Sequence, residues 1–276
     1  EIASPHTAKS IVVLPPEDND PDIDVIKTVL AITNNPNRRA EAYNIVTQIR
    51  NAKNMDVLKL VGEKDNVQAV LTGDLIARVV AQTSRQSGLS IVYTELMNFG
   101  GDEIYFKQEP ALAGKTFGQA LLAYEDSCLM GLRKADGKIL LSPAMDTRIE
   151  AGDQVFALSA DDDTIRISNQ SQPPINEAVI RSSGRAVQPR PEKCLILGWN
   201  RSGTTIVREL DNYVAKSSQV TVVADVDNIE KQIRANGGKL KNQTLAVEEG
   251  ETTDRDLLNK LGVEDYDHVI VLAYST

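Results

Sequence analysis

Two periodicities of apolar residues alternate along most of this 276-residue chain. Short apolar runs of strand length, such as 11–14 and 67–71, are followed by segments whose apolar residues recur every three or four positions. Val25 and Val29 belong to one such helical face. Strands that alternate with amphipathic helices indicate a parallel sheet with right-handed crossovers.

The same alternation locates the expected elements in three regions. The first has strands at 10–14, 43–49 and 67–71, helices at 21–32 and 55–61, and then a helix pair from 75 to 97 that breaks at Ser87-Gly88. The middle region, 102–164, has a hairpin around Asp136-Gly137, a strong turn pair. The last has strands at 194–197, 219–224, 244–247 and 268–272, with helices at 204–213, 228–235 and 253–261.

These elements predict an α/β protein in which two halves of doubly wound, Rossmann-like parallel sheets flank a small α+β module. The expected segments are the second half of one such domain with its helix pair, the α+β module, a linker and the first half of another domain, at 1–100, 101–165, 166–191 and 192–276. The opening and closing strands are near-copies of each other, so we expect a piece of a longer protein. The front and back strands could complete one sheet, within a chain or between chains.

Composition excludes several function classes. A formal net charge of −9 argues against nucleic acid, which is bound by Lys and Arg. No apolar run approaches the roughly 20 residues of a membrane helix, so no direct membrane insertion is expected. His6 and His268 lie far apart, and no G-x-S-x-G or P-loop motif is present. Cys128 and Cys194 both lie in apolar runs, which predicts buried free thiols.

An acidic loop follows the first strand. Hard oxygen ligands at close spacing suit Ca²⁺, and ligands of open α/β sheets collect at the carboxyl ends of strands. The candidate metal ligands are Glu17, Asp18, Asp20 and Asp22. The alternative is a solvated loop whose acids favour the dipole of the following helix.

A glycine-containing turn follows the strand at 194–197 and opens a helix. Gly198, Asn200 and Gly203 occupy the positions of a G-x-G-x-x-G fingerprint, and Asp225 ends the next strand, where a ribose-binding acid belongs. NAD or another adenine nucleotide is therefore a candidate cofactor. Asn200 replaces the second glycine, and the alternative is a turn that has kept its geometry and lost its nucleotide.

Several motifs together resemble the RCK (regulator of potassium conductance) domains, in particular those of the Castor/Pollux branch of ion channels. They are Leu112-x-Gly114-Lys115, the hairpin from Gly131 to Gly137, Glu150-x-Gly152-Asp153, Ser84-Arg85-Gln86-x-Gly88-Leu89, Ala160–Thr164 and Gly198-Trp199. The resemblance implies a gating-ring fragment at the cytoplasmic face of a membrane, linked to the transmembrane pore of its parent protein. It also implies a homo-oligomer formed through the crossover helices at 75–97.

The favoured hypothesis is thus a ligand-sensing regulatory module of a cation channel, not an enzyme, with calcium as the first candidate ligand. The alternative is a nucleotide- or NAD-sensing regulatory module of a potassium uptake system. An oxidoreductase is disfavoured because no catalytic His, Lys or Tyr constellation accompanies the turn at 198–203.

Overall fold

The computed structural model describes residues 4–17, 20–168, 176–181, 188–235 and 239–274. The chain divides into two compact units. The first joins residues 1–87 to residues 188–276, and the second comprises residues 88–187. Helix α4 (Leu89–Met97) thereby groups with the middle of the chain, whereas helix α3 (Thr72–Arg85) groups with its two ends.

The first parallel sheet of unit 1 has the order β1-β2-β3 (Ile11–Val13, Asn44–Ile49 and Asn66–Leu71). Helices α1 (Pro21–Thr33) and α2 (Asn54–Val61) share a core with one face of β2, to which Ile45 and Ile49 contribute. The opposite face is open among the described residues, where Val12 and Val46 are 65% and 41% exposed. One-sided burial explains the strict alternation along β2.

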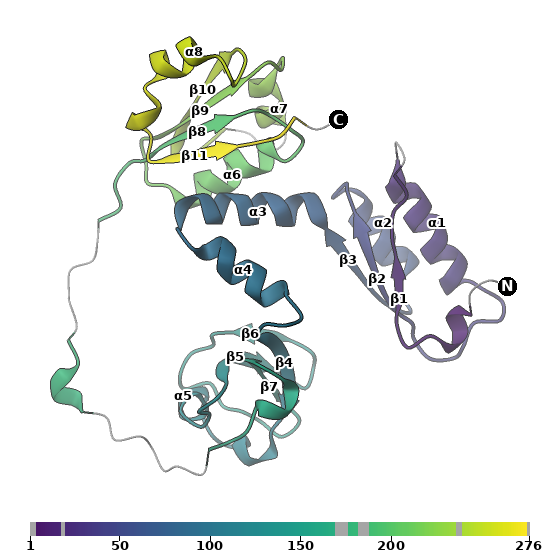
Figure 1. Ribbon diagram of the computed structural model, residues 1–276. Helices are drawn as coiled ribbons and strands as arrows, with labels where there is room; N and C mark the ends of the chain where they lie inside the picture. Colours follow the sequence, from purple (N-terminus) through teal and green to yellow (C-terminus); the bar gives the residue numbers. More distant parts are fainter. Residues whose placement is uncertain (1–3, 18–19, 169–175, 182–187, 236–238, 275–276) are drawn as a thin grey trace. The chain divides into compact units, whose positions relative to one another are not determined.

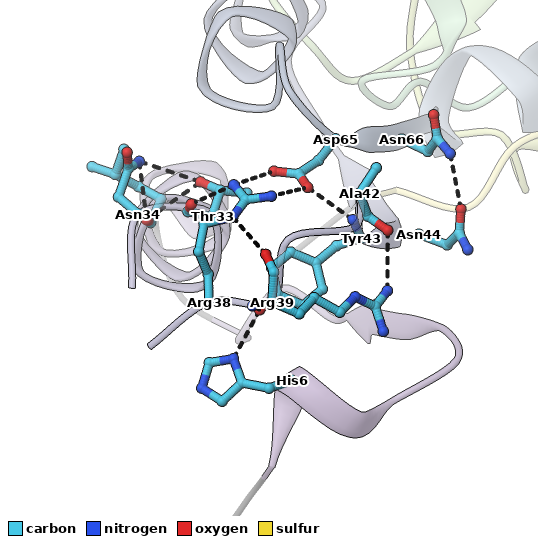
Figure 2. Close-up of polar contacts among 11 residues, drawn as sticks. His6, Thr33, Asn34, Arg38, Arg39, Ala42, Tyr43, Asn44, Asp65 and Asn66 are labelled. Atoms are coloured by element: carbon cyan, nitrogen blue, oxygen red, sulfur yellow. Dashed lines mark hydrogen bonds and ion pairs between the residues drawn. The ribbon is translucent and has the colours of Figure 1, made fainter. Parts of the chain in front are cut away.

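A buried polar network lies at the amino-terminal ends of these three strands (Figure 2). Asp65, directly before β3, accepts hydrogen bonds from the guanidinium of Arg38 at 3.0 and 3.2 Å and from the backbone N–H of Tyr43 at 2.8 Å. The Tyr43 hydroxyl is hydrogen-bonded to Nδ1 of His6 at 2.8 Å. These contacts tie the segment before β1 to the loops before β2 and β3.

The second parallel sheet has the order β10-β9-β8-β11. Its strands are β8 (Lys193–Leu197), β9 (Ser218–Ala224), β10 (Gln243–Glu249) and β11 (His268–Val271), with helices α6 (Gly203–Tyr213), α7 (Ile229–Ala235) and α8 (Arg255–Leu261). This order is that of the first four strands of a doubly wound sheet, and the expected α/β Rossmann-like class is confirmed.

The expectation that the front and back strands complete one sheet is wrong within the chain, because they form two separate sheets (Figure 1). Helix α3 gives the physical reason. Its small residues Ala77 and Ala81 are fully buried in the core of the four-stranded sheet, and α3 packs on α6. The helix therefore occupies a face of that sheet, and β1–β3 do not extend the edge at β11.

Unit 2 holds an antiparallel sheet of order β4-β7-β5-β6. Its elements are β4 (Glu103–Gln108), α5 (Phe117–Leu121), β5 (Cys128–Arg133), β6 (Ile139–Leu141) and β7 (Gln154–Ser159). Short 3-10 helices at Pro5–Thr7, Pro110–Leu112, Asp162–Thr164, Glu177–Val179 and Val263–Asp265 complete the described elements. The hairpin turns at Gly137 with a φ of +87°, as the Asp-Gly pair predicts.

One cysteine assignment needs correction. Cys194 is buried, as expected, but Cys128 is exposed. In the sheet register Cys128 stands opposite Leu158, which pairs with the exposed Ile104, so it lies on the face turned away from the core of unit 2. Its apolar neighbours in sequence, such as Leu129, point to the other face.

Candidate functional site

The acidic loop after β1 leads directly into α1. Asp20 is the residue before the helix and is exposed, as is Glu17, while Asp18 lies outside the described residues. Asp22 differs from them, because it is buried with an exposed fraction of 1%. The four predicted metal ligands are therefore near one another in sequence, but Asp22 points inward.

The Asp22 carboxylate is held by three donors from the segment after β2. It accepts hydrogen bonds from the backbone N–H of Arg50 at 2.8 Å, the backbone N–H of Asn51 at 2.9 Å and the side-chain amide of Asn54 at 2.8 Å. Burial alone would raise the pKa of Asp22, but these hydrogen bonds and the charge of Arg50 outweigh it and lower the pKa below its ordinary value. Asp22 therefore joins the start of α1 to the carboxyl end of β2.

No group of three or more His, Cys, Asp or Glu side chains with metal-binding geometry occurs among the described residues. A calcium ion at the loop would thus depend on Glu17, Asp18 and Asp20 together with backbone carbonyls or water. Asp22 would serve it as an anchor of the loop, because its oxygens already accept hydrogen bonds.

The glycine turn after β8 has the geometry that its first glycine predicts. Gly198 adopts a φ of +89°, and a Cβ there would lie 2.1 Å from the carbonyl oxygen of Leu272, just after β11. The backbone N–H of Leu272 in turn donates to the carbonyl of Leu197 at 2.8 Å. Glycine is required here for the close approach of two neighbouring strands.

Two side chains fill this turn. The Trp199 ring is buried against Gly203, where a Cβ would come within 2.7 Å of the ring, and its indole N–H donates to Oε1 of Gln232 at 3.0 Å. The Asn200 amide donates to the carbonyl of Ala273 at 2.9 Å, and its oxygen accepts from the N–H of Ser202 at 2.9 Å. The Asn200 side chain thus occupies the backbone N–H of Ser202, a donor that a pyrophosphate would use.

Asp225, the candidate ribose ligand, is exposed at the end of β9. It lines a cavity of about 400 Å³ together with Glu251, Thr252, Thr253 and Tyr274. The sequence-predicted nucleotide residues are therefore brought to one edge of the sheet. The turn itself is packed, whereas the space beside Asp225 is open.

Polar contacts that the apolar periodicity does not indicate hold α3 to the four-stranded half of unit 1, which comprises the second parallel sheet and its helices α6, α7 and α8. Glu192, before β8, accepts from the guanidinium of Arg85 at 2.6 and 3.2 Å and is 3.2 Å from Nε2 of His268. About two turns earlier in α3, Arg78 pairs with Glu209 of α6 at 3.1 Å. Arg85 belongs to the Ser84-Arg85-Gln86 motif, which marked the segment without indicating its partner.

Family models match two parts of the chain. A model described as "Castor and Pollux, part of voltage-gated ion channel" matches residues 73–176, and one described as the TrkA-N domain matches residues 194–276. A probable ion channel CASTOR of Oryza sativa subsp. japonica is 30% identical over 275 residues, which cover 96% of this chain. These matches support an RCK domain of the Castor/Pollux type.

Other members give the same picture. The probable ion channel POLLUX of Oryza sativa subsp. japonica is 28% identical over 96% of this RCK region. The chain spans about 30% and 28% of the lengths of these two relatives. Both relatives are named as ion channels.

Among solved structures, the human SLO3 gating ring has a TM-score of 0.67 at 16% identity, with 98% of this chain and 57% of that chain covered. This likeness supports the fold of the RCK region. Within the described residues, no helix combines the length and apolarity needed to cross a bilayer.

Proposed function

We propose that this region is a ligand-sensing part of a gating ring, located at the cytoplasmic face of a membrane and connected to the pore of its parent channel. The observation that carries the proposal is the family match across both units, together with the path of the chain between them. Ala77 and Ala81 of helix α3 are buried in the core of the four-stranded sheet, and Gly88, with a φ of +85°, separates the helix from α4 in unit 2. A glycine elbow at this place suits a joint between two bodies.

In this proposal, ligand binding shifts a population between two arrangements of paired lobes. The shift requires that the ligand binds one arrangement more tightly than the other. The contacts of Glu192 with Arg85 and His268 fix the carboxyl end of α3 to unit 1 directly before the elbow. A movement of the four-stranded half would therefore also move the end of α3, and through Gly88 it would reach the first residue of α4.

Helix α4 is the proposed surface for homo-oligomer formation. None of its residues is buried, and Ile91 and Met97 are 72% and 70% exposed. Phe99, just beyond the helix, is 92% exposed. An exposed group of large apolar side chains marks an interaction site, and a second copy of the same helix is the partner that a ring of identical subunits supplies.

The double replacement Ile91→Asp and Phe99→Asp is expected to weaken self-association at least 100-fold, since each buried apolar side chain contributes about 1.5–3 kcal/mol on both sides of a twofold interface. Light scattering after size-exclusion chromatography measures the mass. The unchanged chain should exceed its monomer mass of 30.1 kDa at micromolar concentration, and the variant should approach it.

Leu60→Asp is the matched control, because Leu60 is 73% exposed on α2 of unit 1 and is not part of the proposed surface. Its mass should equal that of the unchanged chain. A monomeric unchanged chain, or an α4 variant that retains the oligomer mass, would rule out this surface.

Calcium is the proposed ligand, bound at the acidic loop by Glu17, Asp18 and Asp20. The loop lies at the carboxyl end of β1, the edge at which open α/β sheets bind ligands. Asp22 fixes the end of the loop at the start of α1 through its hydrogen bonds to Arg50, Asn51 and Asn54. Calcium-selective stabilisation of the chain is the expected consequence.

NAD or another adenine nucleotide is the second candidate, favoured only by the cavity beside Asp225. The packed Trp199 and the bonded Asn200 leave the turn poorly suited to a pyrophosphate. A nucleotide-sensing module of a potassium uptake system therefore ranks second.

A further inference from the structure

Unit 1 contains a cavity of about 290 Å³ whose lining combines two arginines and several neutral polar side chains with the apolar Ile76. Arg50 comes from the end of β2, Thr72 from the start of α3, and Asn200, Arg201 and Ser202 from the turn after β8. None of the described lining residues is acidic, although the whole chain has a formal net charge of −9. The cavity is thus a local concentration of positive charge in an acidic protein.

Neither arginine of this cavity forms an ion pair within the described part of the chain. Ten other arginines have a side-chain or backbone partner there, as Arg38 does with Asp65 and Arg85 with Glu192. An unpaired guanidinium keeps its five N–H donors free, and its planar geometry matches a phosphate.

Two described carboxylates beside the lining residues in sequence or by charge are already engaged. Asp22 interacts electrostatically with Arg50, but its two oxygens accept three hydrogen bonds and its side chain is buried. Asp74, in the first turn of α3, pairs with Arg78 at 2.7 Å. Neither carboxylate lines the cavity, so neither neutralises its open side.

Hydroxyl and amide groups add neutral donors to the two charges. Thr72 and Ser202 contribute hydroxyls. The Asn200 amide also lines the cavity, but one of its N–H groups already donates to the carbonyl of Ala273. Helices α3 and α6 begin at this cavity without a side-chain cap, which adds to the positive potential. Together these groups resemble the donor set with which proteins bind phosphate.

We propose that this cavity binds a phosphate group, carried either by inorganic phosphate or by a small phosphate ester. Arg50 and Arg201 provide the charge from the two halves of unit 1, and Thr72 and Ser202 add hydroxyl donors. The site differs from the nucleotide fingerprint, because Arg50 and Thr72 lie outside the turn at 198–203. It goes beyond the proposed gating function and does not depend on which ligand gates.

Calorimetric titration of the chain with inorganic phosphate at constant ionic strength tests this site. Arg50→Gln and Arg201→Gln should each weaken phosphate binding at least 10-fold. Arg255→Gln is the matched control, because Arg255 is an exposed arginine on α8 outside the cavity. Melting temperatures in phosphate-free buffer check that all three variants are folded.

Methyl phosphate forms the second arm of the experiment. Affinity equal to or above that of inorganic phosphate supports an ester as the ligand, and weaker affinity supports the free ion. The proposal is overturned if the unchanged chain does not bind phosphate. It is equally overturned if all three arginine variants bind phosphate as tightly as the unchanged chain does. That result would indicate a non-specific electrostatic effect and not a site in this cavity.

Discussion

Replacement of Gly198 by alanine is expected to unfold the four-stranded half of unit 1, with a loss of more than about 4 kcal/mol of stability. The backbone of Gly198 has a φ of +89°, which costs an alanine about 1–2 kcal/mol. The larger part is steric, because the new Cβ would lie 2.1 Å from the carbonyl oxygen of Leu272. Relief of that clash would separate β8 from β11.

Gly137→Ala is the matched control for backbone strain alone. Gly137 has a nearly equal φ of +87°, but no atom lies within 4 Å of the position of its Cβ. Only the strain of about 1–2 kcal/mol is expected there. Chemical denaturation followed by circular dichroism measures both losses. Equal losses in the two variants would contradict the assigned close contact of β8 with β11.

Replacement of Asp22 by alanine is expected to cost about 3–4 kcal/mol, because hydrogen bonds to a charged acceptor contribute about 1.5–3 kcal/mol and the donors would lose their partner. The backbone N–H groups of Arg50 and Asn51 are the donors at stake. Urea unfolding in the presence of EDTA measures the loss without bound metal. Asp20→Ala, at an exposed neighbouring position, should lose less than about 1 kcal/mol.

The Asp22 contribution also has a defined pH dependence. The folded-state pKa of Asp22 lies below its ordinary value, so the folded state favours the ionised carboxylate. Its contribution is complete above the unfolded pKa of about 3.9 and is lost as the pH falls through the lower folded value. The stability difference between the unchanged chain and Asp22→Ala should therefore shrink below about pH 4. A difference that is constant down to pH 2, or equal losses for Asp20→Ala and Asp22→Ala, would indicate that Asp22 is no anchor.

Regular elements of this chain were largely predictable from its apolar periodicity. Helix α4 has the expected limits of 89 and 97, and the expected helix at 204–213 differs from α6 by one residue. Local signals suffice for such elements, since an apolar face and a break such as Ser87-Gly88 are both local. The hairpin at Gly137 followed from its turn chemistry for the same reason.

The partner of α3 was not predictable in this way. Its apolar face indicated burial, but Ala77 and Ala81 give no sign of whether they pack on the sheet that precedes them or on α6, more than 120 residues later. Small residues allow close approach to many surfaces, and only the tertiary fold selects one. The ion pair of Arg85 with Glu192 has the same origin.

The candidate site shows a similar limit. The sequence identified Asp22 as an acid beside other acids, whereas its three donors come from residues 50–54 after the neighbouring strand. Likewise Asn200 was expected to weaken nucleotide binding because it replaces the second glycine of the G-x-G-x-x-G fingerprint. The structure adds that its side chain bonds across to the carbonyl of Ala273. The composition of a loop does not reveal which of its polar groups are already satisfied.

The measurement that tests the proposed sensing role most directly is the melting temperature of the chain with and without millimolar CaCl₂, with MgCl₂ as the reference salt. A ligand at about 100 times its dissociation constant adds about 2.7 kcal/mol to the folded state, which corresponds to several degrees for a chain of this size. We expect a calcium-selective rise that the double variant Glu17→Gln and Asp20→Asn abolishes. The nearby Asp24→Asn, which removes an exposed charge paired with Lys27, should retain it. No response to calcium, together with a rise in NAD or ATP, would contradict the calcium account and favour the nucleotide-sensing alternative.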